Sequence, residues 1–418
     1  MLAGTALAER ATATDLPTAT DLATATDLST ATDLPQAEEP LAEDITAACL
    51  INGQAKHQHL DQVRDGNYRT FLEVPMVSGV CALEITPPEG ATAGGILIKW
   101  RSDPVATAVQ VRNNQGDWVN VAACEADFNA QYIKLPDLAQ SFRIIGRDNP
   151  AQKLQICELT VVTPGRLPED FQVWQWPTPP VDLMVFAGHP DDEMLWFGGM
   201  IPYYAKARGK QVVAVCASFC VYNRRLELLD CLWTCGVRVY PVFARLEDVL
   251  TQDVNAIFNT WGRQRAYNLV AQLYRQYRPS VVALQDEKGE YGHGVHRAFS
   301  LAGRMAVDIA ADPGALVETQ DQYPPYEVPK VYVHLWKENQ IQMDWHQPLE
   351  ELGGLTAYEV AEKGFACHVS QIGPGKRWDM EEALGGQWDN SLFGLFHTAV
   401  GPDVLGGDLF ENIADEGD

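Results

Sequence analysis

The chain has 418 residues, of which 46% are hydrophobic and 21% charged, a composition typical of globular domains. Its 31 basic and 56 acidic residues give a net charge of −25, so phosphate backbones and anionic membranes would repel it. No apolar run approaches the roughly 18 residues that cross a bilayer. We therefore expect two or three domains, no nucleic-acid partner and no membrane span, and we leave the oligomeric state open.

Residues 1–45 carry an acidic repeat, T-A-T-D-L-x, with its aspartates at Asp15, Asp21, Asp27 and Asp33. One leucine per hexad buries too little apolar surface to offset the entropy of ordering, so we predict a disordered acidic linker. Ala6-Leu7-Ala8 fits a signal-peptidase site, although the basic and apolar regions of a signal peptide are missing. This possible remnant favours an extracellular or cell-surface location, with the cytoplasm as the alternative.

Residues 46–165 read as short strands. Val109 and Val111 alternate with polar residues, the turn 113–117 follows, and Val119 and Val121 resume the alternation, which predicts a hairpin. Two further stretches alternate in the same way: Ile96, Ile98 and Trp100, and Cys157, Leu159 and Val161. The pattern predicts an antiparallel β-sandwich.

The stretch 60–73, LDQVRDGNYRTFLE, resembles the discoidin-like (galactose-binding-like) sandwiches. That resemblance implies a glycan-binding module. It also implies a disulfide between the first and last strands, for which Cys49 and Cys157 would be the candidates.

Residues 166–180 are rich in proline and are predicted to be a stiff linker. Residues 181–418 then alternate buried apolar runs with helical stretches, which predicts a doubly wound α/β domain with a mainly parallel sheet. The predicted strands are 183–187, 212–217, 237–243, 281–284 and 331–336. One helix is predicted after the first strand, ending at residue 208, and two more are predicted at about 224–235 and 262–277.

Two polar segments follow the first and fourth of these strands, G-H-P-D-D-E at 188–193 and E-Y-G-H-G-V-H at 290–296. Ligands of open parallel sheets bind beyond the carboxyl ends of the strands. His189 and Asp192 lie three residues apart on a tight turn, and His296 comes from the neighbouring loop. Two imidazoles and one carboxylate leave open positions on a zinc ion, as in catalytic sites, and the same set also suits Fe²⁺.

The remaining polar residues have roles in such a site. Water bound to zinc approaches a pKa of about 7, and Asp191 would act as its general base. His293 would stabilise an oxyanion or protonate the leaving amine. An isolated H-x-x-H pair is often incidental, and a D-D-E run often marks a solvated helix start. Here both patterns occur together, on two loops that a parallel sheet would bring close to one another, and this combination favours a functional site.

G-H-P-D-D-E followed about a hundred residues later by G-H-G-V-H-R resembles the PIG-L (LmbE-like) zinc-dependent deacetylases, over residues 180–310. Members of that family remove the acetyl group from N-acetylglucosamine attached to inositols, other sugars or small metabolites. The resemblance implies that His189, Asp192 and His296 bind zinc, that Asp191 is the general base, and that His293 stabilises the tetrahedral intermediate.

A third pattern of that family, R-x-x-E-x-x-x-A-x-x-x-L-G, is met by Arg224, Glu227 and Gly236. The resemblance implies that Arg224 binds substrate, and the alternative is an ion pair with Glu227 at the start of a helix. Cys231 and Cys235 occupy the apolar positions of the pattern, so we interpret them as core residues rather than metal ligands.

Beyond residue 330, His368 and His397 either line a sugar pocket or are buried structural histidines. Trp345 and Trp388 are possible stacking platforms for a sugar.

We therefore expect a zinc-dependent hydrolase that removes the N-acetyl group from an acetylated amino sugar or glycan. The alternatives are an amidase of the same family acting on another amide, and a catalytically inactive glycan-binding surface protein.

Overall fold

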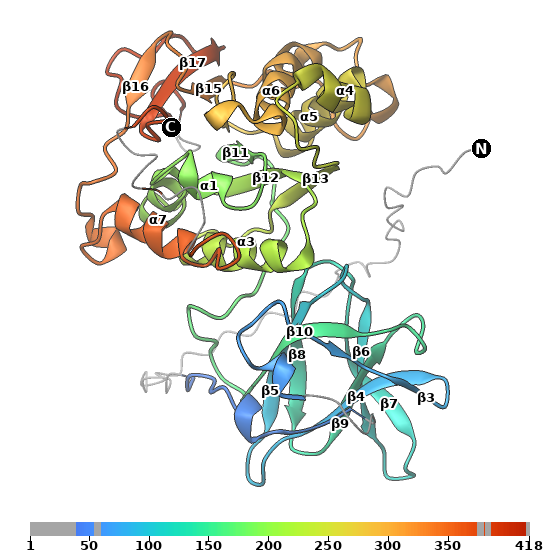
Figure 1. Cartoon of the computed structure of the whole chain (residues 1–418). Helices are drawn as coiled ribbons and strands as arrows, with labels where there is room; N and C mark the ends of the chain where they lie inside the picture. Colours follow the sequence, from blue (N-terminus) through green and yellow to red (C-terminus); the bar gives the residue numbers. More distant parts are fainter. Residues whose placement is uncertain (1–38, 54–59, 374–379, 381–385, 415–418) are drawn as a thin grey trace, which may run out of the picture. The chain divides into compact units, whose positions relative to one another are not determined.

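The computed structural model describes residues 39–53, 60–373, 380 and 386–414 (Figure 1). The acidic repeat, for which disorder is predicted, lies outside the described residues. Among the described helices, none combines the length and the apolar character that a membrane crossing requires.

The amino-terminal part of the described chain forms two antiparallel sheets, as predicted (Figure 1). One has the order β1 (Leu50–Gly53), β4 (Val80–Thr86), β9 (Phe142–Gly146), β6 (Thr107–Arg112) and β7 (Trp118–Cys124), with β3 (Met76–Val77) paired to β4. The other has the order β2 (Leu72–Glu73), β10 (Gln155–Val162), β5 (Ala93–Trp100) and β8 (Ala130–Leu138). Two short 3₁₀ turns, η1 (Thr46–Ala48) and η2 (Leu60–Val63), accompany them.

Side-chain alternation explains how the two sheets pack. Leu83 of β4, Ile98 of β5 and Phe142 of β9 belong to one hydrophobic core that takes residues from both sheets. The predicted hairpin is β6 and β7, with Val111 opposite Val119. These buried, alternating side chains stabilise the face-to-face arrangement.

The implied disulfide between Cys49 and Cys157 is wrong, because both cysteines are free. The pairing of β10 with β5 shifts register between Ile156 and Glu158, which breaks the alternation predicted for Cys157. Cys157 therefore packs in the same cluster as Trp174, whereas Leu159 and Cys49 belong to the core between the sheets. The two thiols thus belong to different hydrophobic clusters and do not face one another.

The carboxyl-terminal part of the described chain contains a mixed sheet. Its order is β13 (Val242–Leu246), β12 (Val212–Ser218), β11 (Leu183–Ala187), β14 (Val281–Leu284), β15 (Lys330–His334), β17 (Leu392–Thr398) and β16 (Gln340–Gln342). The first five strands are parallel, and β17 and β16 pair in antiparallel orientation. The mainly parallel sheet is confirmed, with an antiparallel edge.

Helices cover both faces of this sheet (Figure 1). One face carries α1 (Asp192–Leu195), α2 (Met200–Pro202), the π-helical η3 (Tyr203–Ala207), α3 (Tyr222–Thr234) and α7 (Ala357–Phe365). The other carries α4 (Val254–Trp261), α5 (Arg263–Tyr277) and α6 (Gly294–Ala311). The remaining short 3₁₀ turns are η4 (Glu290–Gly292), η5 (Val317–Thr319) and η6 (Glu350–Leu352).

Strand β11 shows why the domain is doubly wound. Leu183 and Val185 pack in the first hydrophobic layer, and Met184 and Phe186 pack in the second. Successive side chains of a strand point to opposite faces, so a strand covered on both sides is apolar throughout.

The third strand of the prediction is misplaced, since β13 spans Val242–Leu246 rather than 237–243. Pro241 has no backbone N–H to donate to a ladder, and pairing with β12 begins at the next residue, Val242. Val239, before the proline, instead forms an isolated bridge with Gln175 of the proline-rich segment.

Candidate active site

The two polar segments meet where the order of the sheet reverses. The chain runs from β11 to β12 and β13 on one side, and then returns to β14 and β15 on the other. Segment 188–193 follows β11, and segment 290–296 comes shortly after β14, the immediate neighbour of β11. A switch point of this kind opens a crevice at the carboxyl ends of the strands.

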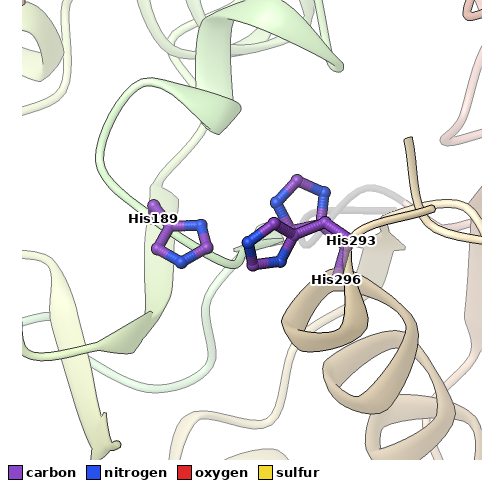
Figure 2. A group of neighbouring side chains, drawn as sticks. All are labelled: His189, His293 and His296. Carbon is purple, nitrogen blue, oxygen red and sulfur yellow. The ribbon is translucent and has the colours of Figure 1, made fainter. Parts of the chain in front are cut away.

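Three imidazole rings gather in this crevice (Figure 2). His189 lies on the turn after β11, and His293 and His296 lie at the start of α6. The ring of His293 is centred 4.9 Å from that of His189 and 4.8 Å from that of His296. The structure thus brings together the histidines of both motifs.

The carboxylate of Asp192 lies close to both predicted histidine ligands, and His293 joins the two histidines in a group that could hold a metal ion. Asp192 Oδ2 lies 3.2 Å from His189 Nδ1 and 3.0 Å from His296 Nε2. Ligand atoms around tetrahedral zinc, with bonds of about 2.0–2.1 Å, lie about 3.3 Å apart. His296 Nε2 is buried and makes no hydrogen bond of acceptable geometry, despite its closeness to Asp192. An unsatisfied nitrogen aimed at a carboxylate and a second imidazole fits a zinc ion.

Partners on the far side of each ring fix the tautomer that a metal requires. His189 Nε2 lies 3.1 Å from Asp248 Oδ1, and His296 Nδ1 lies 2.7 Å from Glu290 Oε2. A proton on each of these nitrogens leaves His189 Nδ1 and His296 Nε2 as the atoms that face the candidate metal position. Burial lowers the pKa of His296, but the charge of Asp192 and the hydrogen bond to Glu290 raise it to about 10, so metal binding has to release a proton from His296 Nε2. The other carboxylate oxygen of Glu290, Oε1, has His334 as its partner, with His334 Nδ1 at 2.8 Å.

The ligand set is also prepared electrostatically. Burial raises the pKa of Asp192, but the charge of His296 and the hydrogen bond to His189 hold it well below its usual range. Glu290 is fully buried, and the hydrogen bonds from His296 and His334 overcome burial to lower its pKa to about 2. Both carboxylates are therefore ionised at neutral pH, the state in which Asp192 can bind a metal and Glu290 can accept from the two histidines.

Gly188, between β11 and His189, permits this close packing. A Cβ atom at this position would lie 2.8 Å from His296 Cδ2 and 3.1 Å from Asp192 Oδ2. Glycine lets the backbone pass beside the ligands.

Asp191 is set apart from the ligands. Its side chain is 15% exposed, and its Oδ1 accepts a hydrogen bond of 2.9 Å from Arg224 Nη2. Burial, followed by the charge of Asp192, raises the pKa of Asp191 to about 7, against the lowering effect of Arg224. A carboxylate with a pKa near the working pH suits a general base.

Arg224 lies beside Asp191 and also donates to the carbonyl of Pro190. The ion pair with Glu227 is not formed, because Glu227 accepts hydrogen bonds from Ser370 N and Oγ at 3.2 and 2.5 Å. Arg224 therefore places a positive charge beside the carboxylate of Asp191.

His293 begins α6, and its Nδ1 accepts from Val295 N at 3.3 Å. Burial and the charges of His296 and His189 lower the pKa of His293 to about 4. A metal cation at the same point would act in the same direction. The ring is therefore neutral at pH 7 and carries its proton on Nε2, which favours a hydrogen-bond donor over a resting cation.

An adjacent cavity of about 590 Å³ is lined by Tyr291 and Trp388, with Lys288 and Lys337 also on its wall. The ring of Tyr291 is centred 5.7 Å from that of His293 and 6.5 Å from that of Trp388. Trp388 thus lies on the wall of the cavity, near Tyr291.

Of the other residues singled out in the sequence, Trp345 and His397 lie away from the crevice, whereas Cys231 and His368 contact Glu193 beside it. Trp345 is 1% exposed and belongs to the hydrophobic core. His397 pairs with Val331 near the amino end of β15, the edge of the sheet opposite to the site. Cys231 and Cys235 pack in the core between α3 and its neighbours. Cys231 also belongs, with Glu193 and His368, to a second group of side chains that could hold a metal ion. His368 is fully buried and pairs with Glu193.

The sequence interpretation missed Asp248, Gln285, Glu290 and His334. Asp248 comes two residues after β13, and Gln285 comes directly after β14. The sequence signal that could have identified these residues was the presence of polar residues directly after each buried strand. Because the third strand was predicted too early, Asp248 was not recognised as such a residue.

Replacing Arg224 by methionine tests its action on Asp191. Without the guanidinium the pKa of Asp191 rises further, because the protonated form is no longer opposed by a positive charge. A general base works only when deprotonated, so we expect kcat/KM to fall more at pH 6 than at pH 8.5. The pH profile, with Arg238→Met as a distant control, measures this; a uniform rise in KM at every pH would instead indicate substrate binding alone.

A histidine–carboxylate cluster at the switch point of a mainly parallel α/β sheet is typical of metal-dependent hydrolases. Residues 184–307 match the model of the PIG-L family, described as GlcNAc-PI de-N-acetylase. This stretch of the chain is therefore a PIG-L family domain.

Two curated relatives match the same part of the protein. A 1D-myo-inositol 2-acetamido-2-deoxy-alpha-D-glucopyranoside deacetylase 2 of Saccharopolyspora erythraea is 37% identical over 176 residues, 36% of this chain and 63% of its own length. A deacetylase of the same description from Mycobacterium leprae is 27% identical over 183 residues, 36% of this chain and 58% of its own. The chain thus spans about three fifths of the length of these relatives.

Among solved structures, the chain is similar to the N,N'-diacetylchitobiose deacetylase of Pyrococcus horikoshii. The TM-score is 0.33 and the sequence identity 18%, over 46% of this chain and 71% of that one.

Proposed function

We propose that the protein is a zinc-dependent N-deacetylase that hydrolyses the acetamido group of an amino sugar. The observation that carries this proposal is the convergence of His189 Nδ1, Asp192 Oδ2 and His296 Nε2, with the carboxylate of Asp191 uncommitted to the ligand set. The names of the curated relatives, both deacetylases of an acetamido sugar, support the same chemistry.

His189, Asp192 and His296 would hold the metal. A bound zinc ion lowers the pKa of water and polarises a carbonyl group. Asp191 provides the base, and because Oδ1 is held by Arg224, we assign Oδ2 as the atom that takes the proton of the attacking water. The same carboxyl group then returns a proton to the departing amine, so that acetate and a free amino sugar are the products.

His293 supplies the second electrostatic element. Its neutral ring donates from Nε2 to the oxygen that becomes negative when the amide carbonyl is attacked. The adjoining cavity, with Tyr291 and Trp388, would receive the sugar ring and its substituent.

His293→Ala removes this donor, so we expect kcat to fall by about 10²–10³-fold, the usual cost of one oxyanion donor. KM and bound zinc should change little, because the three ligands remain. His293→Gln, which keeps a side-chain N–H, should recover part of the loss. An unchanged kcat in His293→Ala would remove His293 from the reaction.

The residues before the α/β domain would keep the enzyme near its glycan. We propose domains at 46–165 and 181–418 joined by the linker 166–180, with the first a glycan-binding module on its resemblance to discoidin-like sandwiches. The pattern at residues 6–8 leads us to place the protein outside the cell or on its surface.

The deciding experiment measures acetate release from a panel of acetylated amino sugars, with metal analysis of the same sample. We expect release from at least one N-acetylglucosamine derivative, loss on chelation, and recovery with zinc. If acetate release recovered with Fe²⁺ and not with zinc, the proposed metal would be iron instead of zinc. Release only from an amide that is not a sugar would change the substrate class, and no release from a zinc-loaded sample would favour a purely glycan-binding protein.

A further inference from the structure

Glu193 has no part in the proposed chemistry, yet it is only 1% exposed next to the ligand Asp192. Both of its carboxylate oxygens are used. Oε2 accepts a hydrogen bond of 2.8 Å from the backbone N–H of Asp191. Oε1 lies 2.6 Å from His368 Nε2 and also accepts from Cys231 Sγ at 3.4 Å.

The backbone of Asp191 needs such support. Its φ is 116°, a conformation that residues with a Cβ rarely adopt. Strained residues of this kind persist only when the surrounding structure holds them. Asp191 precedes α1 as its N-cap, and its side chain makes no capping bond, while the side chain of Glu193 accepts from its backbone N–H. The carboxylate of Asp191 is thereby left free to face Arg224.

His368 brings this support from a distant part of the chain. It follows α7, which packs against α1 and α3, and its ring is fully buried. The 2.6 Å between His368 and Glu193 is a hydrogen-bond distance, shorter than the roughly 3.3 Å between ligand atoms around zinc. Glu193 and His368 therefore form a hydrogen-bonded pair, with Cys231 as a third neighbour.

We propose that Glu193 and His368 are positioning residues that act through Asp191. His368 fixes the carboxylate of Glu193, and Glu193 holds the N–H of Asp191, so that the general base keeps its strained backbone and its orientation. The inference rests on the proposed function for the role of Asp191.

The test compares His368→Ala with His368→Gln, which retains an N–H donor. In His368→Ala we expect kcat to fall by about 10–100-fold, as displacements of a reacting group by a fraction of an ångström do, with KM and bound zinc unchanged. His368→Gln should recover most of the rate. His397→Ala, a histidine on β17 far from the crevice, should behave as the parent protein.

Two further measurements separate positioning from general loss of structure. In an Asp191→Asn background, adding His368→Ala should cost nothing more, because the effect passes through Asp191. Hydrogen exchange of the Asp191 amide should become about tenfold faster in His368→Ala. Should that variant not fold, Glu193→Gln, equal in size but with one acceptor oxygen fewer, takes its place.

Multiplicative losses in the double variant, or an Asp191 amide that exchanges at the parent rate, would overturn the inference. If the parent protein releases no acetate, the proposed function fails, and the amide exchange alone still decides whether Glu193 and His368 hold Asp191.

Discussion

Asp191→Asn is expected to lower kcat for acetate release by about 10²–10⁴-fold, the range that a general base contributes. Asparagine has the shape of aspartate and can still accept a hydrogen bond from Arg224, but it cannot take a proton from water. The three metal ligands are untouched, so bound zinc and the melting temperature should stay close to those of the parent protein.

The pH profile gives the second reading of this variant. Asp191 has its pKa raised to about 7, so in the parent protein kcat/KM should decrease as the pH falls and the base becomes protonated. A bound cation nearby would move this limb to lower pH without reversing its sign. The residual activity of Asp191→Asn should lack the limb. A variant that retains both full rate and the limb would assign the base to another residue.

His296→Ala is expected to abolish both zinc binding and acetate release. Its Nε2 is one of three donor atoms around a single point, and two ligands do not hold a catalytic zinc ion against water. Metal content after dialysis measures the first effect, and acetate assays with added zinc measure the second.

Glu290→Gln is the matched comparison for this variant. Glu290 contacts His296 from the side away from the metal, so its loss should weaken zinc affinity by about 10–100-fold while leaving three ligands in place. Saturating zinc should therefore restore Glu290→Gln and leave His296→Ala inactive. Full metal occupancy and activity in His296→Ala would exclude the site as described.

The sequence predicted those features whose cause is local. Strands β11, β12 and β14 are apolar throughout because both faces are buried, and this pattern can be read directly. His189 and Asp192 share one turn, so their spacing alone places them together. The order of helices and strands then brought His296 to the same edge of the sheet.

Features set by distant partners were beyond the sequence. Strand β16 has three residues and β17 contains Gly394, whose missing Cβ makes room for the carbonyl of Trp336, so neither has a strong strand pattern. Asp248 and His368 contact the site from 59 and 175 residues away. No local periodicity marks such pairs.

The double role of β11 has a consequence for how the domain would respond to its metal. This strand gives alternate side chains to both hydrophobic layers and leads directly into His189. A metal ion bound to His189 would therefore be connected through β11 to both hydrophobic layers. An ion that binds only the native form raises the free energy of unfolding, and here it would do so for both layers together. On heating, the metal-bound domain would then unfold in one cooperative transition, whereas the metal-free protein would unfold first around the crevice.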